Sequence, residues 1–274
     1  MLTSNFECEL LDTERIDCGY LGIGREECQA RGCCWKETHS QYPWCFTKRS
    51  AFQCGYYEVN RLSLEENIVK ADLQFNSNFC PNQFRISDNV NFLAFEAHFD
   101  NENQIRVIIK DKENKNWQIP TDISPTYSTN TTANEAFLKT NDVNFFIEQQ
   151  NGNYFITHQR YRKLSLTVGA SKFGFIITRI ENDEILFDTT AHDNLLIFQK
   201  FYKKLGTSIP ANANIYGLGE NVSSFRKNTQ NTTITMFNQD SPTFPDVNLY
   251  GSHPFYLEHR NGKSHGTVNF SFHL

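Results

Sequence analysis

The chain has 274 residues, enough for one small module and one full-sized domain, and its formal net charge is −5. This charge, together with the lack of a long cluster of Lys and Arg, excludes a typical nucleic-acid-binding surface. No apolar run approaches the roughly 18 residues of a membrane-spanning helix, and the abundance of Phe (24) and Tyr (11) favours strands.

The first residues lack the features of a signal peptide, because residues 1–6 have neither a basic segment nor an apolar run. The cysteines and glycosylation sequons described below require a secretory route. We therefore expect a leader or an anchor to be encoded ahead of this sequence. The expected location is the extracellular space, a membrane-anchored ectodomain or the lysosomal lumen.

Cysteines dominate the N-terminal part of the chain, since seven of the eight lie within the first 54 residues. A segment this short cannot bury enough apolar surface to fold without covalent constraints. Zinc binding is the competing interpretation. However, the chain has no C-x-x-C pair, and the adjacent Cys33 and Cys34 cannot both ligate one tetrahedral ion comfortably. We therefore expect disulfides, with no metal and no cofactor.

The cysteine order resembles that of the trefoil (P-type) domain. The segments that carry the resemblance are residues 14–19 (ERIDCG), 28–35 (CQARGCCW) and 43–46 (PWCF). Six cysteines alone permit fifteen pairings, and the sequence does not choose among them. The resemblance implies a trefoil domain over residues 1–50 with the pairs Cys8–Cys34, Cys18–Cys33 and Cys28–Cys45.

Two cysteines, Cys54 and Cys80, remain outside this module. Because an even remainder in an oxidising compartment favours pairing, we expect a fourth bridge between them. Within the module, Trp35 and Trp44 have two interpretations. They pack over the disulfides of a domain that has little other core, or they stack on the apolar face of a sugar.

Four N-x-[S/T] sequons predict glycosylation of a luminal or extracellular protein. Each triplet alone is a weak signal, but together with the cysteines they agree on the compartment. The four asparagines are Asn130, Asn221, Asn231 and Asn269.

The rest of the chain reads as short strands separated by turns. Ile105, Val107 and Ile109 alternate on one face of a strand, and residues 173–178 form a short apolar run typical of a buried strand. The pair Asn151-Gly152 predicts a hairpin turn. Residues 181–183 (END) predict a second turn. Only residues 63–70 suggest a helical stripe, so we expect a mainly β fold with an antiparallel β-sandwich.

This second part is similar to the N-terminal β-sandwich of glycoside hydrolase family 31, the α-glucosidases. The segments that carry the resemblance are residues 105–111, 117–120, 173–179, 186–189, 215–220 (IYGLGE), 237–240 (FNQD) and 248–256 (NLYGSHPFY). A trefoil ahead of this sandwich is the arrangement of the maltase-glucoamylase, sucrase-isomaltase and lysosomal α-glucosidase group. The resemblance implies a galactose-mutarotase-like sandwich domain over residues 51–266.

The glycines of residues 217–219 (GLG) are not a nucleotide-binding loop. The full G-x-G-x-x-G pattern is absent because position 222 is Val, and no βαβ pattern surrounds the segment. A tight bend near the sugar site is the better interpretation.

The catalytic residues of this family are not found in the sequence. Retaining glycosidases use two carboxylates about 5–5.5 Å apart. The resemblance implies two Asp residues on a (β/α)8 barrel, one in a W-x-D-M-N-E-like segment. None of Trp35, Trp44 and Trp117 has Asp two residues later, and a barrel needs about 250 residues. We expect no catalytic residue in this chain, and the missing barrel as its natural intramolecular partner.

One side chain is a candidate sugar ligand. The resemblance implies that an Asp in an F-N-x-D-like loop hydrogen-bonds sugar hydroxyls, and Asp240 matches this position. The alternative is an ordinary surface carboxylate in a loop. Residues 267–274 depart from the family pattern, and we expect them to be a divergent, truncated tail.

Three functions remain in view. The first is the non-catalytic N-terminal portion of an α-glucosidase, whose parent binds oligosaccharides and hydrolyses terminal α-linked glucose. The main alternative is a secreted, trefoil-containing, lectin-like protein that binds glycans. The third is a purely structural or interaction module.

Overall fold

In the computed structural model of the chain, the described residues are 8–10, 12, 15, 17–20, 22–38, 42–48, 55–76, 89–113, 115, 144–191, 196–211, 213–230, 232–240 and 242–269. The chain divides into two compact units. One is Gln53–Ser208, and the other combines Met1–Phe52 with Ile209–Leu274. Within the described part of the chain, no helix is both long and apolar enough to cross a bilayer.

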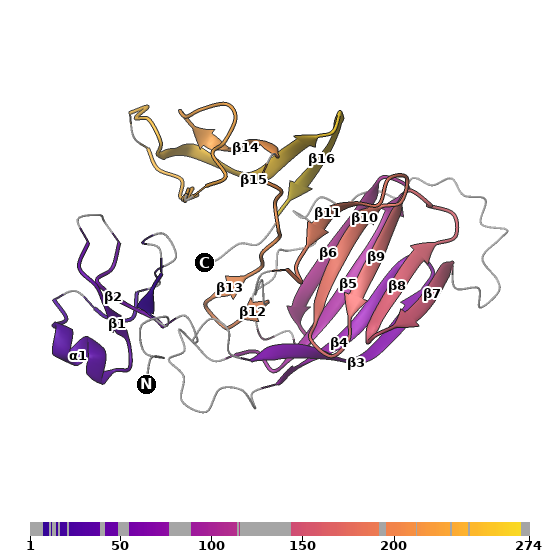
Figure 1. The fold of residues 1–274 in the computed structure, drawn as a ribbon, viewed down its shortest axis with the longest axis horizontal. Coiled ribbons are helices and arrows are strands. Elements are labelled where there is room, and N and C mark those ends of the chain that lie inside the picture. The colour runs from indigo at the N-terminus through magenta and orange to yellow at the C-terminus, as the bar shows by residue number, and fades with distance from the viewer. Residues whose placement is uncertain are drawn as a thin grey trace. The chain divides into compact units, whose positions relative to one another are not determined.

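The N-terminal module has little regular structure (Figure 1). It contains the helix α1 (Arg25–Ala30) and a two-stranded antiparallel sheet of β1 (Cys34–Trp35) and β2 (Cys45–Phe46). Among the cysteines that the structure describes there are three disulfides, and their pairs are the three that the trefoil resemblance implies: Cys8–Cys34, Cys18–Cys33 and Cys28–Cys45. The helix α1 was not predicted, because six residues are too few to show a 3.6-residue stripe.

A buried arginine supplements the disulfides of this module. The Arg15 guanidinium forms an ion pair with Asp12 at 2.7 Å and lies over the ring of Phe46, 4.5 Å from its centroid. It also donates to the carbonyl oxygens of Lys36 and Pro43 at 3.1 and 3.4 Å. The contacts of Arg15 with Lys36, Pro43 and Phe46 join segments that are more than twenty residues apart in sequence, as core contacts do in a larger domain.

The first large sheet has four antiparallel strands in the order β3-β4-β5-β6. The strands are β3 (Tyr56–Glu65), β4 (Ile68–Asn76), β5 (Phe92–Asn101) and β6 (Gln104–Asp111). Buried and partly exposed residues alternate along β4 and β5, as expected for a sheet with one face in the core. Ile105, Val107 and Ile109 pack against that core, as predicted.

The helical stripe suggested for residues 63–70 was wrong. These residues form the end of β3, the turn at Glu66 and Asn67, and the start of β4. Glu66 adopts a left-handed backbone conformation with φ of 38°. Ser63 pairs with Lys70 and Leu64 with Val69 across the hairpin, so the apolar spacing came from two strands folded back on each other.

The second large sheet has five antiparallel strands in the order β11-β10-β9-β8-β7. Its strands are β7 (Phe145–Gln150), β8 (Asn153–His158), β9 (Leu164–Gly169), β10 (Gly174–Arg179) and β11 (Glu184–Asp188). Both predicted turns are confirmed. Asn151 and Gly152 connect β7 to β8 with φ of 51° and 76°, the left-handed pair of a type I′ hairpin, and Asp183 has φ of 52° before β11.

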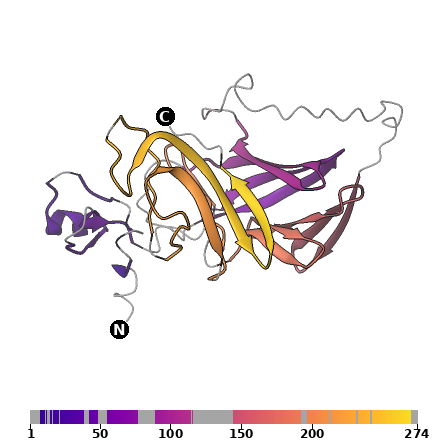
Figure 2. The same ribbon diagram turned by 90° about the horizontal axis from the view of Figure 1, so that it is seen from above.

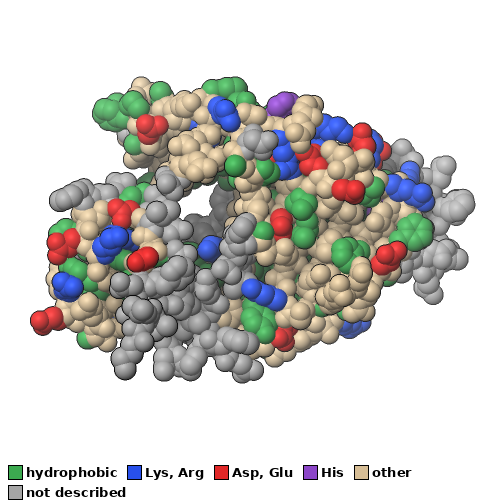
Figure 3. Space-filling view, viewed as in Figure 1, with side chains coloured by type: hydrophobic (Ala, Val, Ile, Leu, Met, Phe, Trp, Pro, Cys, Tyr) green, Lys and Arg blue, Asp and Glu red, His purple; other side chains and the backbone are tan. Residues whose placement is uncertain are grey.

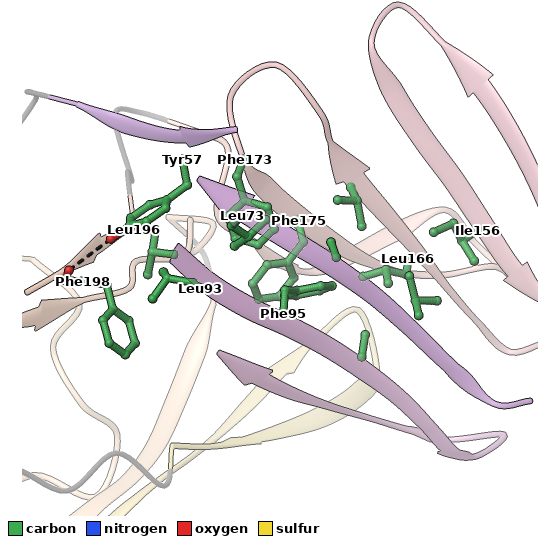
Figure 4. Packing of buried hydrophobic residues seen from close by; sticks show 14 of the residues in the cluster. Tyr57, Leu73, Leu93, Phe95, Ile156, Leu166, Phe173, Phe175, Leu196 and Phe198 are labelled. Carbon is green, nitrogen blue, oxygen red and sulfur yellow. Dashed lines mark hydrogen bonds between the residues drawn. The ribbon is translucent and has the colours of Figure 1, made fainter. Parts of the chain in front are cut away.

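The two large sheets pack face to face and form the main hydrophobic core (Figure 4). Phe95 of β5 lies against Phe173 and Phe175, with ring centroids 5.2 and 5.6 Å away. Tyr57 of β3 closes one end of the core, where its hydroxyl donates to the carbonyl oxygens of Val90 and Phe198 at 2.7 and 3.1 Å. The predicted mainly β fold with an antiparallel sandwich is therefore confirmed.

Two smaller sheets complete the described structure. The hairpin of β12 (Ile197–Phe198) and β13 (Lys203–Lys204) belongs to the same unit as the sandwich. The other sheet has the order β14-β15-β16, and its strands are the orange to yellow ones in Figure 2: β14 (Asn214–Asn221), β15 (Asn248–Arg260) and β16 (Lys263–Val268). It belongs to the other unit and carries the candidate site.

Candidate functional site

The predicted bend at residues 217–219 interrupts the pairing of β14 with β15. Gly217 and Leu218 have φ of 99° and 53°, and the register shifts between Gly217 and Gly219. A Cβ atom at Gly217 would lie 2.5 Å from the carbonyl oxygen of Phe255, so only glycine fits there. These glycines therefore allow a tight backbone bend between two paired strands, as the sequence predicted.

Asp240 lies on the long loop that connects β14 to β15, which we call the Asp240 loop (residues 222–247). The side chain of Asp240 is exposed. Two backbone contacts hold the loop on either side of Asp240. The Gln239 N–H donates to the Leu249 carbonyl oxygen at 3.0 Å, and the Asp246 N–H donates to the Val222 carbonyl oxygen at 3.0 Å. The Asp240 carboxylate is therefore exposed to solvent on a loop that backbone hydrogen bonds attach to the sheet.

Glu220 joins β14 to β15 at the base of this loop, because one of its carboxylate oxygens accepts a hydrogen bond from the Gly251 N–H at 2.8 Å. His253 packs close to Gly251, since a Cβ atom at Gly251 would lie 3.0 Å from its Cε1 atom.

Exposed aromatic side chains flank Asp240 in the sequence, and no role is predicted for them from the sequence alone. Phe225 is 83% exposed and Phe237 is 73% exposed, and Phe244 and Tyr250 are also exposed. Figure 3 shows hydrophobic side chains gathered on the surface formed by the β14–β16 sheet and its loops, at the top of the view. The signal that could have found them is the occurrence of Phe within a stretch rich in Asn, Asp and Pro.

A buried carboxyl group lies on the same sheet. Glu258 of β15 is 2% exposed, with Arg260 Nε at 3.2 Å and His265 Nε2 at 3.3 Å. Burial raises the pKa of Glu258, and the neighbouring Arg260 opposes this rise. Glu258 is enclosed between paired strands, which suits a structural role within the sheet.

Metal-ligating side chains gather at only one place within the described ranges. Cys18, Cys33 and Cys45 have their sulfur atoms within 4.8 Å of one another. All three belong to disulfides, so their thiolates are not available to an ion.

Two of the four sequon asparagines are described. The Asn221 carboxamide donates to the Leu218 carbonyl oxygen at 2.8 Å and accepts from Lys227 Nζ at 2.9 Å. Asn269 follows β16, and its N–H donates to the Pro254 carbonyl oxygen at 2.9 Å. Asn130, Asn231, Cys54 and Cys80 lie outside the described residues.

The two tryptophans of the N-terminal module lie against each other. The rings of Trp35 and Trp44 are perpendicular, with centroids 5.9 Å apart. Trp44 is 45% exposed, and its Nε1 donates to the Thr38 carbonyl oxygen at 3.0 Å. Trp44 therefore combines a fixed orientation with an accessible ring surface.

Two protein-family models match this chain. The trefoil (P-type) domain matches residues 8–48. The glycosyl hydrolase 31 N-terminal galactose mutarotase-like domain matches residues 81–270. The second match extends from the sandwich to the β14–β16 sheet and includes the Asp240 loop.

Known proteins are similar over much of the chain. The lysosomal alpha-glucosidase of Mus musculus is 30% identical over 267 residues, which cover 93% of this chain and 24% of that protein. The alpha-glucosidase of Hordeum vulgare is 32% identical over 182 residues, which cover 65% of this chain and 20% of that protein. The chain thus spans about a quarter or less of the length of these relatives.

Solved structures share the fold. The ER glucosidase II heterodimeric complex matches with a TM-score of 0.51 and 14% identity, covering 79% of this chain and 28% of that chain. A GH31 dextranase of Flavobacterium johnsoniae complexed with glucose matches with a TM-score of 0.50 and 14% identity, covering 74% and 21%. At these identities the likeness concerns the fold alone.

Proposed function

We propose that this chain, which belongs to the glycosyl hydrolase 31 N-terminal galactose mutarotase-like family, is the non-catalytic N-terminal portion of an α-glucosidase. The observation that carries the proposal is the succession of a trefoil domain and this family domain in one chain. Relatives named lysosomal alpha-glucosidase match the chain over 93% of its length and extend well beyond it.

The proposed parent protein cleaves terminal α-linked glucose from oligosaccharides with retention of configuration. That reaction needs a nucleophilic carboxylate and an acid about 5–5.5 Å apart, and both belong to a catalytic barrel outside these 274 residues. The contribution of this chain is Asp240, whose exposed carboxylate accepts hydrogen bonds from sugar hydroxyls at the mouth of the barrel.

The exposed aromatic side chains of the Asp240 loop support an intramolecular partner. Phe225 and Phe237 expose most of their surface to solvent, and exposed apolar patches of this kind mark interaction surfaces. We infer that the catalytic barrel covers these side chains when it is present.

The proposed location is the secretory pathway, in a secreted, membrane-anchored or lysosomal form. The three disulfides require an oxidising compartment. Glycans at Asn130, Asn231 and Asn269, and at Asn221 if its carboxamide is released, suit the same route. A bridge between Cys54 and Cys80 remains part of this proposal.

Sequencing the transcript and the genomic DNA downstream of the codon for His265 tests the proposal. We expect a reading frame that continues into a barrel of about 250 residues with a W-x-D-M segment. A gene that encodes no barrel in any frame after His265 would contradict it.

A glycan-binding trefoil is a second candidate function, favoured by the accessible face of Trp44. Apolar sugar faces stack on aromatic rings, and the hydrogen bond from Trp44 to Thr38 holds this ring in place. Loss of glycan binding in Trp44→Ala, with the disulfides intact, would favour this candidate. Binding of no glycan by the unmodified chain would reject it.

A further inference from the structure

Asn248, the first residue of β15, places a buried carboxamide at the base of the Asp240 loop. The residue is 7% exposed. Its Nδ2 atom lies close to four acceptors: Leu249 O at 3.2 Å, Gly251 O at 3.3 Å, Ser252 Oγ at 3.3 Å and Asn238 Oδ1 at 3.5 Å. Because every one of these partners accepts, Asn248 serves here as a donor.

The two residues that precede Asp240 are both attached to this end of β15. The Gln239 N–H donates to Leu249 O at 3.0 Å, and Gln239 Nε2 donates to Asn248 O at 2.9 Å. Asn238 Oδ1 accepts from both Ser252 Oγ and Asn248 Nδ2. We call this set of contacts the latch. Asp240 therefore follows directly after two residues whose positions are fixed.

The far side of the same loop is attached independently. Val222 and Pro245 form a parallel bridge, and the Asp246 N–H donates to Val222 O at 3.0 Å. The two attachments lie close to Asp240 in the sequence, at Gln239 on one side and at Pro245 and Asp246 on the other. The entropy of ordering the short segment between them is small compared with that of the whole loop.

The side chain of Asn248 is not needed for strand pairing. Asn248 pairs with Asn221 through the backbone, which any residue other than proline can do. Burying a carboxamide is unfavourable unless it is hydrogen-bonded. The Nδ2 atom of Asn248 has acceptors, whereas its Oδ1 atom is buried with no hydrogen-bond partner in the described part of the chain. Its donors point to the loop residue Asn238 and to the turn at Gly251 and Ser252, so its side chain orders the loop.

We propose that Asn248 is a positioning residue that holds the Asp240 loop in its sugar-contacting geometry before any barrel is present. The proposal rests on the proposed function for the role of Asp240, but the preformed loop is a property of this chain alone. Preorganisation lowers the entropic cost of binding. The loop then needs no contact with the barrel to present its carboxylate.

Hydrogen exchange of the purified chain tests the proposal, with Asn248→Asp as the variant. The substitution keeps the shape and removes the Nδ2 donors at neutral pH. We expect the Gln239 amide, which donates to Leu249 O, to exchange about fivefold faster, as for the loss of one hydrogen bond. Amides of β15 and β16 away from the loop should keep their rates.

Asn214→Asp is the matched control. Asn214 lies at the other end of the same strand pair, and its Nδ2 donates to His259 O at 3.0 Å. This variant should leave the Gln239 amide unchanged. Asn238→Ala removes the exposed partner of the latch without touching the buried side chain, and it should accelerate the same amide if Asn248→Asp fails to fold.

A pH profile separates positioning from a general loss of stability. A protonated Asp carries one O–H donor, so the ratio of the Asn248→Asp rate to the wild-type rate should fall as pH drops through the pKa of the new carboxyl group, which burial raises above that of an exposed Asp. Three results would each overturn the proposal. The first is a Gln239 amide whose exchange rate is unaffected by both Asn248→Asp and Asn238→Ala, the second is an equal acceleration by Asn214→Asp, and the third is a rate ratio that does not depend on pH. The two tests are independent, because sequencing can disprove the proposed function without affecting the exchange result, and the exchange result can disprove the role of Asn248 without affecting the sequencing.

Discussion

Among the described residues, the trefoil's buried apolar cluster consists of Leu10, Cys34 and Phe46, whereas the sandwich core contains sixteen buried residues, most of them from the two large sheets. The trefoil has three disulfides in about forty residues. A small module buries too little surface to fold through the hydrophobic effect alone, and a domain of more than a hundred residues does not have this difficulty. The two regions therefore show the two ways in which a chain can offset the entropy of folding.

Reduction of the disulfides should have the largest effect, and it should unfold the trefoil but not the sandwich. Each bridge contributes about 2–4 kcal/mol in a module of this kind. We expect residues 8–46 to lose hydrogen-exchange protection after reduction, while β3–β11 keep theirs. Trefoil peptides that remain protected with free thiols would contradict the covalent account.

Phe95→Ala should destabilise the sandwich but not the trefoil. The side chain is fully buried between the sheets, against Phe173 and Phe175, and its truncation should destabilise the sandwich by about 3–5 kcal/mol. Urea denaturation measures this cost, and exchange in the trefoil should not change. Phe146→Ala, at an exposed position on β7, is the matched control, and an equal loss there would refute the assignment of the core.

His158 provides a further difference between the two regions, because its protonation should lower the stability of the sandwich in mild acid. The residue is 1% exposed, its Nδ1 accepts from the N–H groups of Arg160 and Tyr161, and its Nε2 donates to Asn67 Oδ1 at 2.8 Å. This arrangement requires a neutral ring. Burial, aided by Arg160, lowers the pKa of His158 to about 4.

The sign of the pH effect follows from this depressed pKa. An unfolded histidine has a pKa of about 6.5, so between pH 6.5 and 4 the unfolded state binds a proton that the native state does not. The stability is fully present above pH 6.5, and about 3 kcal/mol of it should be lost as pH falls to 4. Urea denaturation of the sandwich at pH 7 and pH 4 checks this. His158→Asn should flatten the dependence, and an unchanged slope would exclude His158 as its cause.

The sequence predicted the parts of the fold that depend on local chemistry. Asn151-Gly152 forms the expected turn because few other pairs tolerate two positive φ values. Both family resemblances are confirmed by the family models. The helical reading of residues 63–70 failed because a two-residue turn at Glu66 and Asn67 carries no Gly or Pro to mark it.

The candidate site was only partly predictable. Asp240 was found through a motif, but the latch depends on contacts between Asn238 and residues ten or more positions later. Such contacts require the register of β15, which the sequence pattern does not fix. His158 follows Ile156 by two positions and so faces the core, yet the pattern does not show that backbone N–H groups complete its hydrogen bonds.

The most direct test of the central claim is glucose release by the purified, disulfide-intact chain from maltose and from a nitrophenyl α-glucoside. The account predicts no release above a blank without protein, because this chain supplies a loop and a scaffold but not the nucleophile and acid of the two-step displacement. Steady release that co-purifies with the chain and disappears in Asp240→Asn would show that it is an enzyme in its own right and contradict the account.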